Sequence, residues 1–265
     1  MTRQRLRSPC IGVFDSGVGG LSVLRALRQR LPMAPLLYLG DVAFAPYGER
    51  APAEVVARCE RIVDHLVTSD AGVIVVACNT ATVLGIDALR ARWPELAFVG
   101  VEPGVKPAAA LTATRRIAVL ATPATAQSAR LRHLIGTFAA GVHVHIEPCP
   151  GLAALIERGA YDAGELRSLL APLCANVRAA RVDTVVLGCT HYPFVAAALR
   201  ELLGTQVTLV DTADAVAERV ASLWRCSDEQ RARLRVFSTG ASAAMATLLK
   251  RCTGLEHAVV EHAPI

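Results

Sequence analysis

Short apolar runs alternate along the chain with segments whose apolar residues recur at helical spacing. Residues 11–14 form a run of strand length, and residues 21–31 carry leucines three or four positions apart. The alternation continues with predicted strands at 36–39, 71–77, 116–120, 142–146, 182–188 and 209–211, and with predicted helices at 54–67, 152–158 and 166–180 and one ending near residue 92. This rhythm is typical of an α/β fold in which helices flank mostly parallel sheets.

The second part of the pattern resembles the first. Residues 11–16 are similar to residues 117–122, and residues 74–80 are similar to residues 185–190. A segment with two prolines and a glycine at 102–107 separates the copies and predicts a crossing between domains. We therefore expect two pseudosymmetric α/β domains that face each other, formed by residues 1–101 with 210–265 and by residues 102–209.

Each predicted half has a cysteine directly after a buried strand, Cys78 in the first and Cys189 in the second. Ligands of open α/β sheets bind at this carboxyl edge. We expect Asn79 or Thr80 to cap the helix after Cys78, and Thr190 to cap the helix after Cys189. A thiol at a helix N-terminus has a lowered pKa, so both cysteines are candidate reactive groups. The structural alternative is that both are small residues where strand and helix pack closely.

Two facing thiols suit proton transfer at a carbon centre. One thiolate removes a proton and the opposing thiol delivers one to the other face, which inverts the centre. Asp15, at the end of the first strand, and His191, two residues after Cys189, are placed to assist the thiols. A helix cap at Asp15 and a surface position for His191 are the structural alternatives.

Composition indicates which class of protein carries these residues, in which compartment, and with which partners. The 265 residues are 53% apolar and 19% charged, which favours a globular protein with a sizeable core. Eight cysteines without a C-x-x-C pair argue against a disulfide scaffold. Asp15 interrupts the first apolar run, and no run is long enough to span a membrane, so we expect a cytoplasmic protein. The net charge of +5 is scattered and aromatics are only 5%, which argues against nucleic acid as the primary partner.

Two other patterns point elsewhere. Gly17-x-Gly19 after a strand, with Asp41 after the next strand, partly matches a dinucleotide-binding fingerprint, although Ser22 stands at its third glycine. A possible metal-binding strand face comes from four alternating residues: His143, His145, Glu147 and Cys149. A solvated strand face is the more common origin of such alternation, and no second ligand cluster completes the site.

Several motifs together resemble one known family. They are GVFDSGVGGL at 12–21, PYG at 46–48, CNTA at 78–81, EPG at 102–104, TPAT at 122–125, CP at 149–150 and GCTHYP at 188–193. They span nearly the whole chain in order, and in this combination the chain resembles the glutamate racemases of the aspartate/glutamate racemase superfamily. It departs from the family's pattern at 41–45 and in the small residues at 151–156.

The resemblance implies a homodimeric enzyme that interconverts L- and D-glutamate for peptidoglycan synthesis, with neither pyridoxal phosphate nor a metal. It also implies that the active site lies in the cleft between the two α/β domains. It implies that Cys78 is the base for the D-enantiomer and Cys189 the base for the L-enantiomer, assisted by Asp15, His191 and the acidic Glu157. The implied substrate contacts are Asp15, Ser16, Tyr47, Gly48, Asn79, Thr80, Thr190 and His191. A racemase of aspartate or a related amino acid, a Rossmann-type dinucleotide enzyme and a non-catalytic binding protein remain as alternatives.

Overall fold

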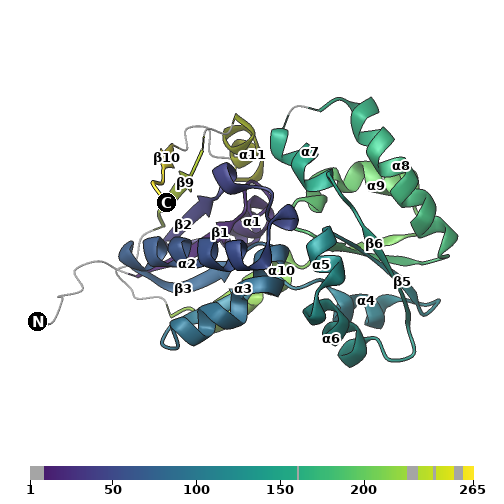
Figure 1. Cartoon of the computed structure of the whole chain (residues 1–265), viewed down its shortest axis with the longest axis horizontal. Helices are drawn as coiled ribbons and strands as arrows, with labels where there is room; N and C mark the ends of the chain where they lie inside the picture. The colour runs from purple at the N-terminus through teal and green to yellow at the C-terminus, as the bar shows by residue number, and fades with distance from the viewer. Residues whose placement is uncertain (1–8, 160, 226–231, 241–242, 254–258) are drawn as a thin grey trace, which may run out of the picture.

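The chain folds into two α/β halves that lie side by side (Figure 1). The computed structural model describes residues 9–159, 161–225, 232–240, 243–253 and 259–265, without the side chains of 243–244 and 251–253. Each half has its own sheet and its own apolar clusters. The α/β fold class is therefore confirmed, while the domain boundaries at 101/102 and 209/210 stay a prediction.

The first sheet has six parallel strands in the order β10-β9-β2-β1-β3-β4. Their bounds are β1 Cys10–Asp15, β2 Leu36–Gly40, β3 Ala71–Val76, β4 Ala97–Gly100, β9 Leu234–Ser238 and β10 Val260–His262. The expectation that the tail returns to the first half is confirmed, because β9 pairs with β2. The central strand β1 is buried from Ile11 to Asp15, which is why it reads as a continuous apolar run rather than an alternating one.

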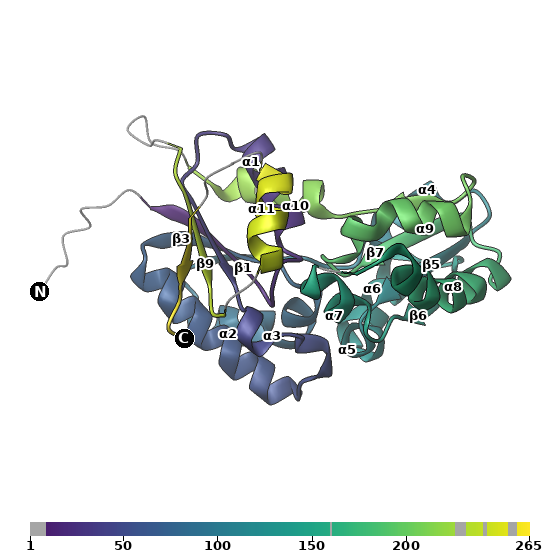
Figure 2. The ribbon, with the colours of Figure 1, turned by 90° about the horizontal axis from the view of Figure 1, so that it is seen from above.

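Helices cover both faces of this sheet (Figure 2). One face packs against α1 (Leu21–Arg30), α10 (Ala213–Leu223) and α11 (Ala243–Thr253), and the other against α2 (Pro52–Thr68) and α3 (Asn79–Arg92). Successive side chains of a strand point to opposite faces. Val13 accordingly packs in the first cluster, while Phe14 packs in the second.

The second sheet has four parallel strands in the order β6-β5-β7-β8. Their bounds are β5 Arg116–Ala121, β6 His143–Pro148, β7 Thr184–Gly188 and β8 Thr208–Val210. Its helices are α4 Val105–Leu111, α5 Pro123–Gln127, α6 Ala129–Phe138, α7 Leu152–Arg158, α8 Ala163–Ala179 and α9 Ala196–Leu203. The order β2-β1-β3-β4 in the first sheet has the same connectivity as β6-β5-β7-β8 in the second. The predicted internal repeat is therefore confirmed in the topology.

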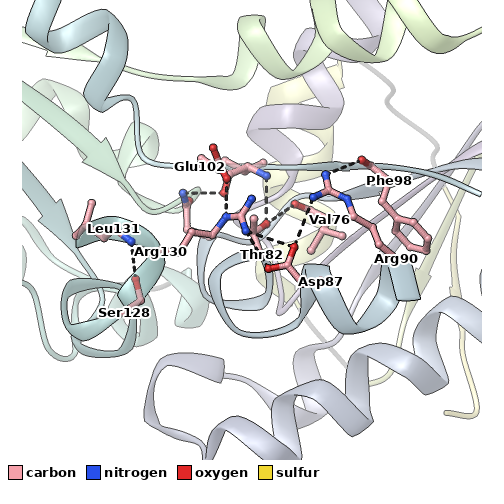
Figure 3. Close-up of polar contacts among 11 residues, drawn as sticks. Val76, Thr82, Asp87, Arg90, Phe98, Glu102, Ser128, Arg130 and Leu131 are labelled. Atoms are coloured by element: carbon pink, nitrogen blue, oxygen red, sulfur yellow. Dashed lines mark hydrogen bonds and ion pairs between the residues drawn. The ribbon is translucent and has the colours of Figure 1, made fainter. Parts of the chain in front are cut away.

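The chain crosses between the halves twice, after β4 and after β8. The two crossings lie against each other, since a Cβ atom on Gly104 would lie 2.8 Å from Thr212. Ion pairs join the halves beside the first crossing, where Arg130 of α6 bonds to Glu102 of the crossing and to Asp87 of α3 (Figure 3). The Arg130–Asp87 pair thus connects a helix of each half beside the crossing.

None of the helices in the described part of the chain combines the length and apolar character needed to cross a bilayer. The described cysteine side chains are all free thiols: Cys10, Cys59, Cys78, Cys149, Cys174 and Cys189. Of the two others, Cys226 lies outside the described residues and the side chain of Cys252 is not described.

Candidate active site

A pocket between the halves brings most of the predicted site residues together. The first half contributes Ser16, Tyr47, Gly48, Cys78, Asn79 and Thr80, and the second contributes Glu157, Cys189 and His191. Asp15 and Thr190 do not line the pocket, although both are buried next to residues that do. They bond to each other across the halves, because the Thr190 hydroxyl donates to Asp15 Oδ2 at 3.0 Å.

Cys78 ends the loop after β3 and is itself the N-cap of α3. Its Sγ accepts a hydrogen bond from the Ala81 backbone N–H at 3.5 Å, and its thiol lies 3.7 Å from the Ser16 hydroxyl. The prediction that Asn79 or Thr80 caps this helix is therefore wrong. Cys78 has the extended backbone of an N-cap residue, so its sulfur takes the position that a serine oxygen would have.

The predicted lowering of the Cys78 pKa is also wrong. Burial raises the pKa of this thiol well above its usual range, and the negative charge of Asp15 raises it further. The Ala81 N–H and the Ser16 hydroxyl act in the opposite direction but do not outweigh the loss of solvent. Cys78 therefore rests as a neutral thiol.

Cys189 follows β7 but does not stand at the start of an α-helix. A short 3₁₀ turn, η3 (Tyr192–Val195), comes first, and α9 begins only at Ala196. The predicted Thr190 cap is accordingly wrong, since the Thr190 side chain bonds to Asp15 instead. The partner of the Cys189 thiol is His191, whose Nδ1 lies 3.7 Å from the sulfur.

His191 is buried between Cys189 and Glu157. Its Nε2 lies 2.7 Å from Glu157 Oε2, while Nδ1 faces the sulfur. Burial alone would lower the pKa of His191, but its hydrogen bonds to Cys189 and Glu157 and the charge of Asp15 raise that pKa well above its usual value. The surface alternative for this histidine is excluded, and its imidazolium form is stabilised beside a thiol.

Asp15 lies at the bottom of the site with no solvent exposure. Its Oδ1 accepts from the Gly17 N–H at 2.7 Å, in the turn that leads into α1. Burial raises the pKa of Asp15, Glu157 adds to this rise, and His191 opposes it. No hydrogen bond joins Asp15 to Cys78 among the described contacts, so its influence on that thiol is electrostatic.

The glycine-rich turn at 17–20 admits side chains from the other half. Glu157 Oε2 accepts from the Val18 N–H at 3.0 Å. A Cβ atom on Gly17 would collide with the Glu157 carboxylate, and one on Gly19 would collide with the His191 ring. Because Gly17 and Gly19 have no side chains, the Glu157 carboxylate and the His191 ring can approach the turn closely.

Asp41 is not available to a dinucleotide. It follows β2 as predicted, but its buried carboxylate forms a two-point ion pair with Arg58 and accepts from the hydroxyls of Tyr47 and Thr239. In the dinucleotide interpretation Asp41 would bind the ribose, but its carboxylate is already occupied by these partners.

Three of the four alternating residues, His145 and Glu147 of β6 and Cys149 directly after it, form contacts within the protein. His145 Nε2 lies 2.8 Å from Glu147 Oε2, and Asn176 donates to the other carboxylate oxygen. The buried Cys149 thiol donates to the Glu147 carbonyl, and burial raises the pKa of Cys149 to about 12. Within the described residues, no cluster of three or more His, Cys, Asp or Glu side chains is placed to hold a metal ion.

Several pocket residues were absent from the predicted site, among them Thr122 and Cys149. Thr122 lies 3.0 Å, hydroxyl to hydroxyl, from Thr80 and joins the halves across the pocket. Cys149 lines the wall beside Cys189. The internal repeat contained the signal for Thr122, because it is the counterpart of Ser16.

Comparison with known proteins agrees with this geometry. The family model described as Asp/Glu/hydantoin racemase matches residues 5–220.

The chain belongs to the Asp/Glu/hydantoin racemase family.

Within the family, similarity extends over most of the chain. It is 50% identical to the glutamate racemase of Pseudomonas syringae pv. tomato over 80% of this chain and 78% of that protein. It is 44% identical to the glutamate racemase of Stutzerimonas stutzeri over 96% of this chain and 97% of that protein. The expected resemblance to glutamate racemases is confirmed.

Solved structures agree with the family assignment. The glutamate racemase of Escherichia coli, solved with L-glutamate and the activator UDP-MurNAc-Ala, has a TM-score of 0.84 at 32% identity, over 97% of this chain and 98% of that one. The glutamate racemase isoform RacE1 of Bacillus anthracis has a TM-score of 0.83 at 28% identity, over 97% and 98%.

Proposed function

We propose that this protein interconverts L- and D-glutamate by two-base proton transfer at Cα, without a cofactor. The observation that carries the proposal is that Cys78 and Cys189, from the carboxyl edges of two different sheets, line one pocket. Its relatives from Pseudomonas syringae and Stutzerimonas stutzeri, both glutamate racemases, support the choice of substrate.

In the L-to-D direction, the Cys189 thiolate removes the Cα proton and the Cys78 thiol delivers its own proton to the opposite face. The electron pair of the broken C–H bond stays at Cα and forms the new C–H bond. Cys189 ends as a thiol and Cys78 as a thiolate, so the D-to-L reaction uses the same groups in reverse. The electrons balance within the amino acid, and no external oxidant or reductant is needed.

The surroundings of the two thiols suit these starting states. The His191 imidazolium, 3.7 Å from the sulfur of Cys189, is placed to stabilise the negative charge that the reaction requires there. Burial and Asp15 keep Cys78 as the thiol that donates. The α-ammonium group of a bound amino acid brings a positive charge beside Cys78, which offsets the charge of Asp15 when the Cys78 thiolate forms.

Polar groups of the pocket fit the two ends of an amino acid. Asn79 Oδ1 is buried and accepts no hydrogen bond from the described residues, so it is placed to accept one from an ammonium group. The hydroxyls of Ser16 and Thr80 can donate to a carboxylate. We include Tyr47 and Gly48 as substrate contacts. We include Thr190, Asp15, His191 and Glu157 as groups that position other side chains of the site or carry its charges.

Deuterium exchange tests the reaction. Incubation of the protein with L-glutamate in D2O should give loss of optical rotation together with deuterium at Cα, and D-glutamate should behave in the same way. Absence of exchange with both enantiomers would overturn the proposal. A panel containing aspartate decides whether another amino acid is the preferred substrate.

Matched cysteine variants test the two bases. Cys78→Ala and Cys189→Ala should each lower kcat by at least about 1,000-fold, because one face of Cα loses its proton carrier. Cys174→Ala is the control, since Cys174 is a buried free thiol of α8 outside the pocket. An active Cys78 or Cys189 variant contradicts the mechanism.

We also infer a cytoplasmic homodimer that supplies D-glutamate for peptidoglycan. The free thiols support a reducing compartment, because a disulfide between Cys78 and Cys189 would disable both bases. Sedimentation equilibrium tests the dimer. Rescue of a bacterial strain that requires D-glutamate tests the physiological role.

A further inference from the structure

Asp41 is a buried charge that the reaction does not use, and it binds a residue of the pocket wall. Its Oδ1 accepts from Arg58 Nη2 at 2.6 Å and from the Thr239 hydroxyl at 2.8 Å. Its Oδ2 accepts from Arg58 Nε at 2.8 Å and from the Tyr47 hydroxyl at 2.7 Å. These four hydrogen bonds involve both carboxylate oxygens, and the side chain has no solvent exposure.

The segment that Asp41 holds has little regular structure of its own. Residues 41–50 contain two three-residue 3₁₀ turns, η1 (Val42–Phe44) and η2 (Tyr47–Glu49), joined by an extended link. The Thr239 hydroxyl, which donates to Asp41, also accepts from the Ala43 N–H. Such a segment keeps its position through side-chain anchors rather than through a helix or strand.

The same segment forms one wall of the pocket. Ala45, Pro46, Tyr47 and Gly48 all line it. Gly48 packs tightly against the other half, since a Cβ atom there would lie 3.1 Å from the Cβ of Thr122. A shift of this wall therefore changes the pocket and its contact with the second half.

Arg58 connects the anchor to the rest of the first half. It projects from α2, is mostly buried, and donates a further hydrogen bond to the Ile265 carbonyl at 2.7 Å. A buried ion pair is weak evidence for stability, because desolvation of the two charges offsets their attraction. Its placement behind Tyr47 points to a different role.

We propose that the buried Asp41–Arg58 pair positions Tyr47 and the wall 45–48 for binding of the amino acid. The inference rests on the proposed racemisation and adds two positioning residues to it. Asp41 acts through the Tyr47 hydroxyl, so the pair affects how well substrate binds more than it affects proton transfer between the cysteines.

Steady-state kinetics in both directions test this role. Asp41→Asn and Tyr47→Phe should each raise KM for both enantiomers about tenfold, with kcat changed less than about threefold. The double variant should be no worse than the more damaged single variant, because both substitutions break one path. Arg58→Met should resemble Asp41→Asn, and Arg58→Lys, which keeps the charge without the two-point fork, should recover part of the loss.

Val63→Ala is the matched control. Val63 is fully buried on α2, and its side chain has no polar atom that could join the hydrogen bonds of Asp41, Arg58 and Tyr47. Its loss should lower the melting temperature while leaving both KM values unchanged. Tyr47→Phe and Arg58→Lys carry the test if Asp41→Asn does not fold.

The outcomes separate this inference from the proposed function. If the unaltered protein racemises no amino acid, the proposed function fails and this inference with it. If it is active and the folded variants keep its KM values, only the inference is overturned. Fully additive effects of Asp41→Asn and Tyr47→Phe also overturn it, because Asp41 would then not act through Tyr47.

Discussion

The imidazole of His191 lies 2.7 Å from the carboxylate of Glu157, on the side of the ring opposite to Cys189. Glu157 thus holds the ring in place and stabilises its charged form. The proposed Cys189 thiolate depends on that charged form.

Removal of the Glu157 charge should narrow the pH range of activity. In Glu157→Gln the pKa of His191 falls, because one of the groups that raises it is lost. The high-pH limb of kcat/KM for L-glutamate should move to lower pH, with activity on the alkaline side reduced by roughly 10- to 100-fold. Glu165→Gln, on the exposed surface of α8, is the control. A pH profile unchanged from the parent protein would contradict this role for Glu157.

The protonated form of His191 should also stabilise the folded protein. Its folded-state pKa lies above its unfolded value of about 6.5, so its contribution to the free energy of unfolding is complete below that pH. The contribution is lost as pH rises through the folded-state pKa. The melting temperature of His191→Asn should therefore fall furthest below the parent protein at pH 5–6, and the gap should shrink at alkaline pH. A gap that widens with rising pH would show that the imidazolium is not stabilised by the fold.

Asp15 should oppose stability at neutral pH. Its folded-state pKa is raised by burial, so the ionised carboxylate destabilises the folded protein once pH exceeds the unfolded value of about 3.9. Asp15→Asn keeps the shape and can still accept from the Gly17 N–H. We expect a melting temperature higher by about 2–4 °C at pH 7 and racemisation lower by at least about 100-fold. Calorimetry and the exchange assay check the two effects, and a lower melting temperature at pH 7 would refute the first.

The glycine turn offers a matched pair of substitutions. Gly17→Ala should displace Glu157, because the new Cβ would overlap its carboxylate, and activity should fall by at least about tenfold. Gly136→Ala in α6 meets no atom within 4 Å and should stabilise the protein by about 0.5–1 kcal/mol without affecting activity. Urea unfolding and initial rates measure both. Equal activity in the two variants would mean that the Glu157 contact is dispensable.

The sequence was most informative where structure depends on local pattern. The buried strands appear as continuous apolar runs because parallel strands are covered on both faces. The repeat placed Cys78 and Cys189 at matching strand ends, since the same connectivity occurs in both sheets. The short strand β4 and the C-terminal strands β9 and β10 were not predicted, because their apolar runs are brief, and β9 also pairs with β2, which is distant in sequence.

The site details that the sequence could not supply depend on contacts between the halves. The Thr190 side chain bonds to Asp15, 175 residues away, and therefore does not cap a helix. The raised pKa of Cys78 likewise comes from burial, which capping patterns do not encode. Asp41 stands at a strand end in both a dinucleotide fold and this one, and its contact with Arg58, which the sequence does not show, helps to separate the two interpretations.

The two chain crossings beside Gly104 and Thr212 constrain how the pocket can open. Because both connections lie together, the halves cannot slide past each other without stretching one of them. Rotation about the shared line through the crossings remains available, and it breaks no strand pairing in either sheet. Any such rotation has to break the hydrogen bonds that join the halves at the pocket, among them Thr190–Asp15 and Val18–Glu157.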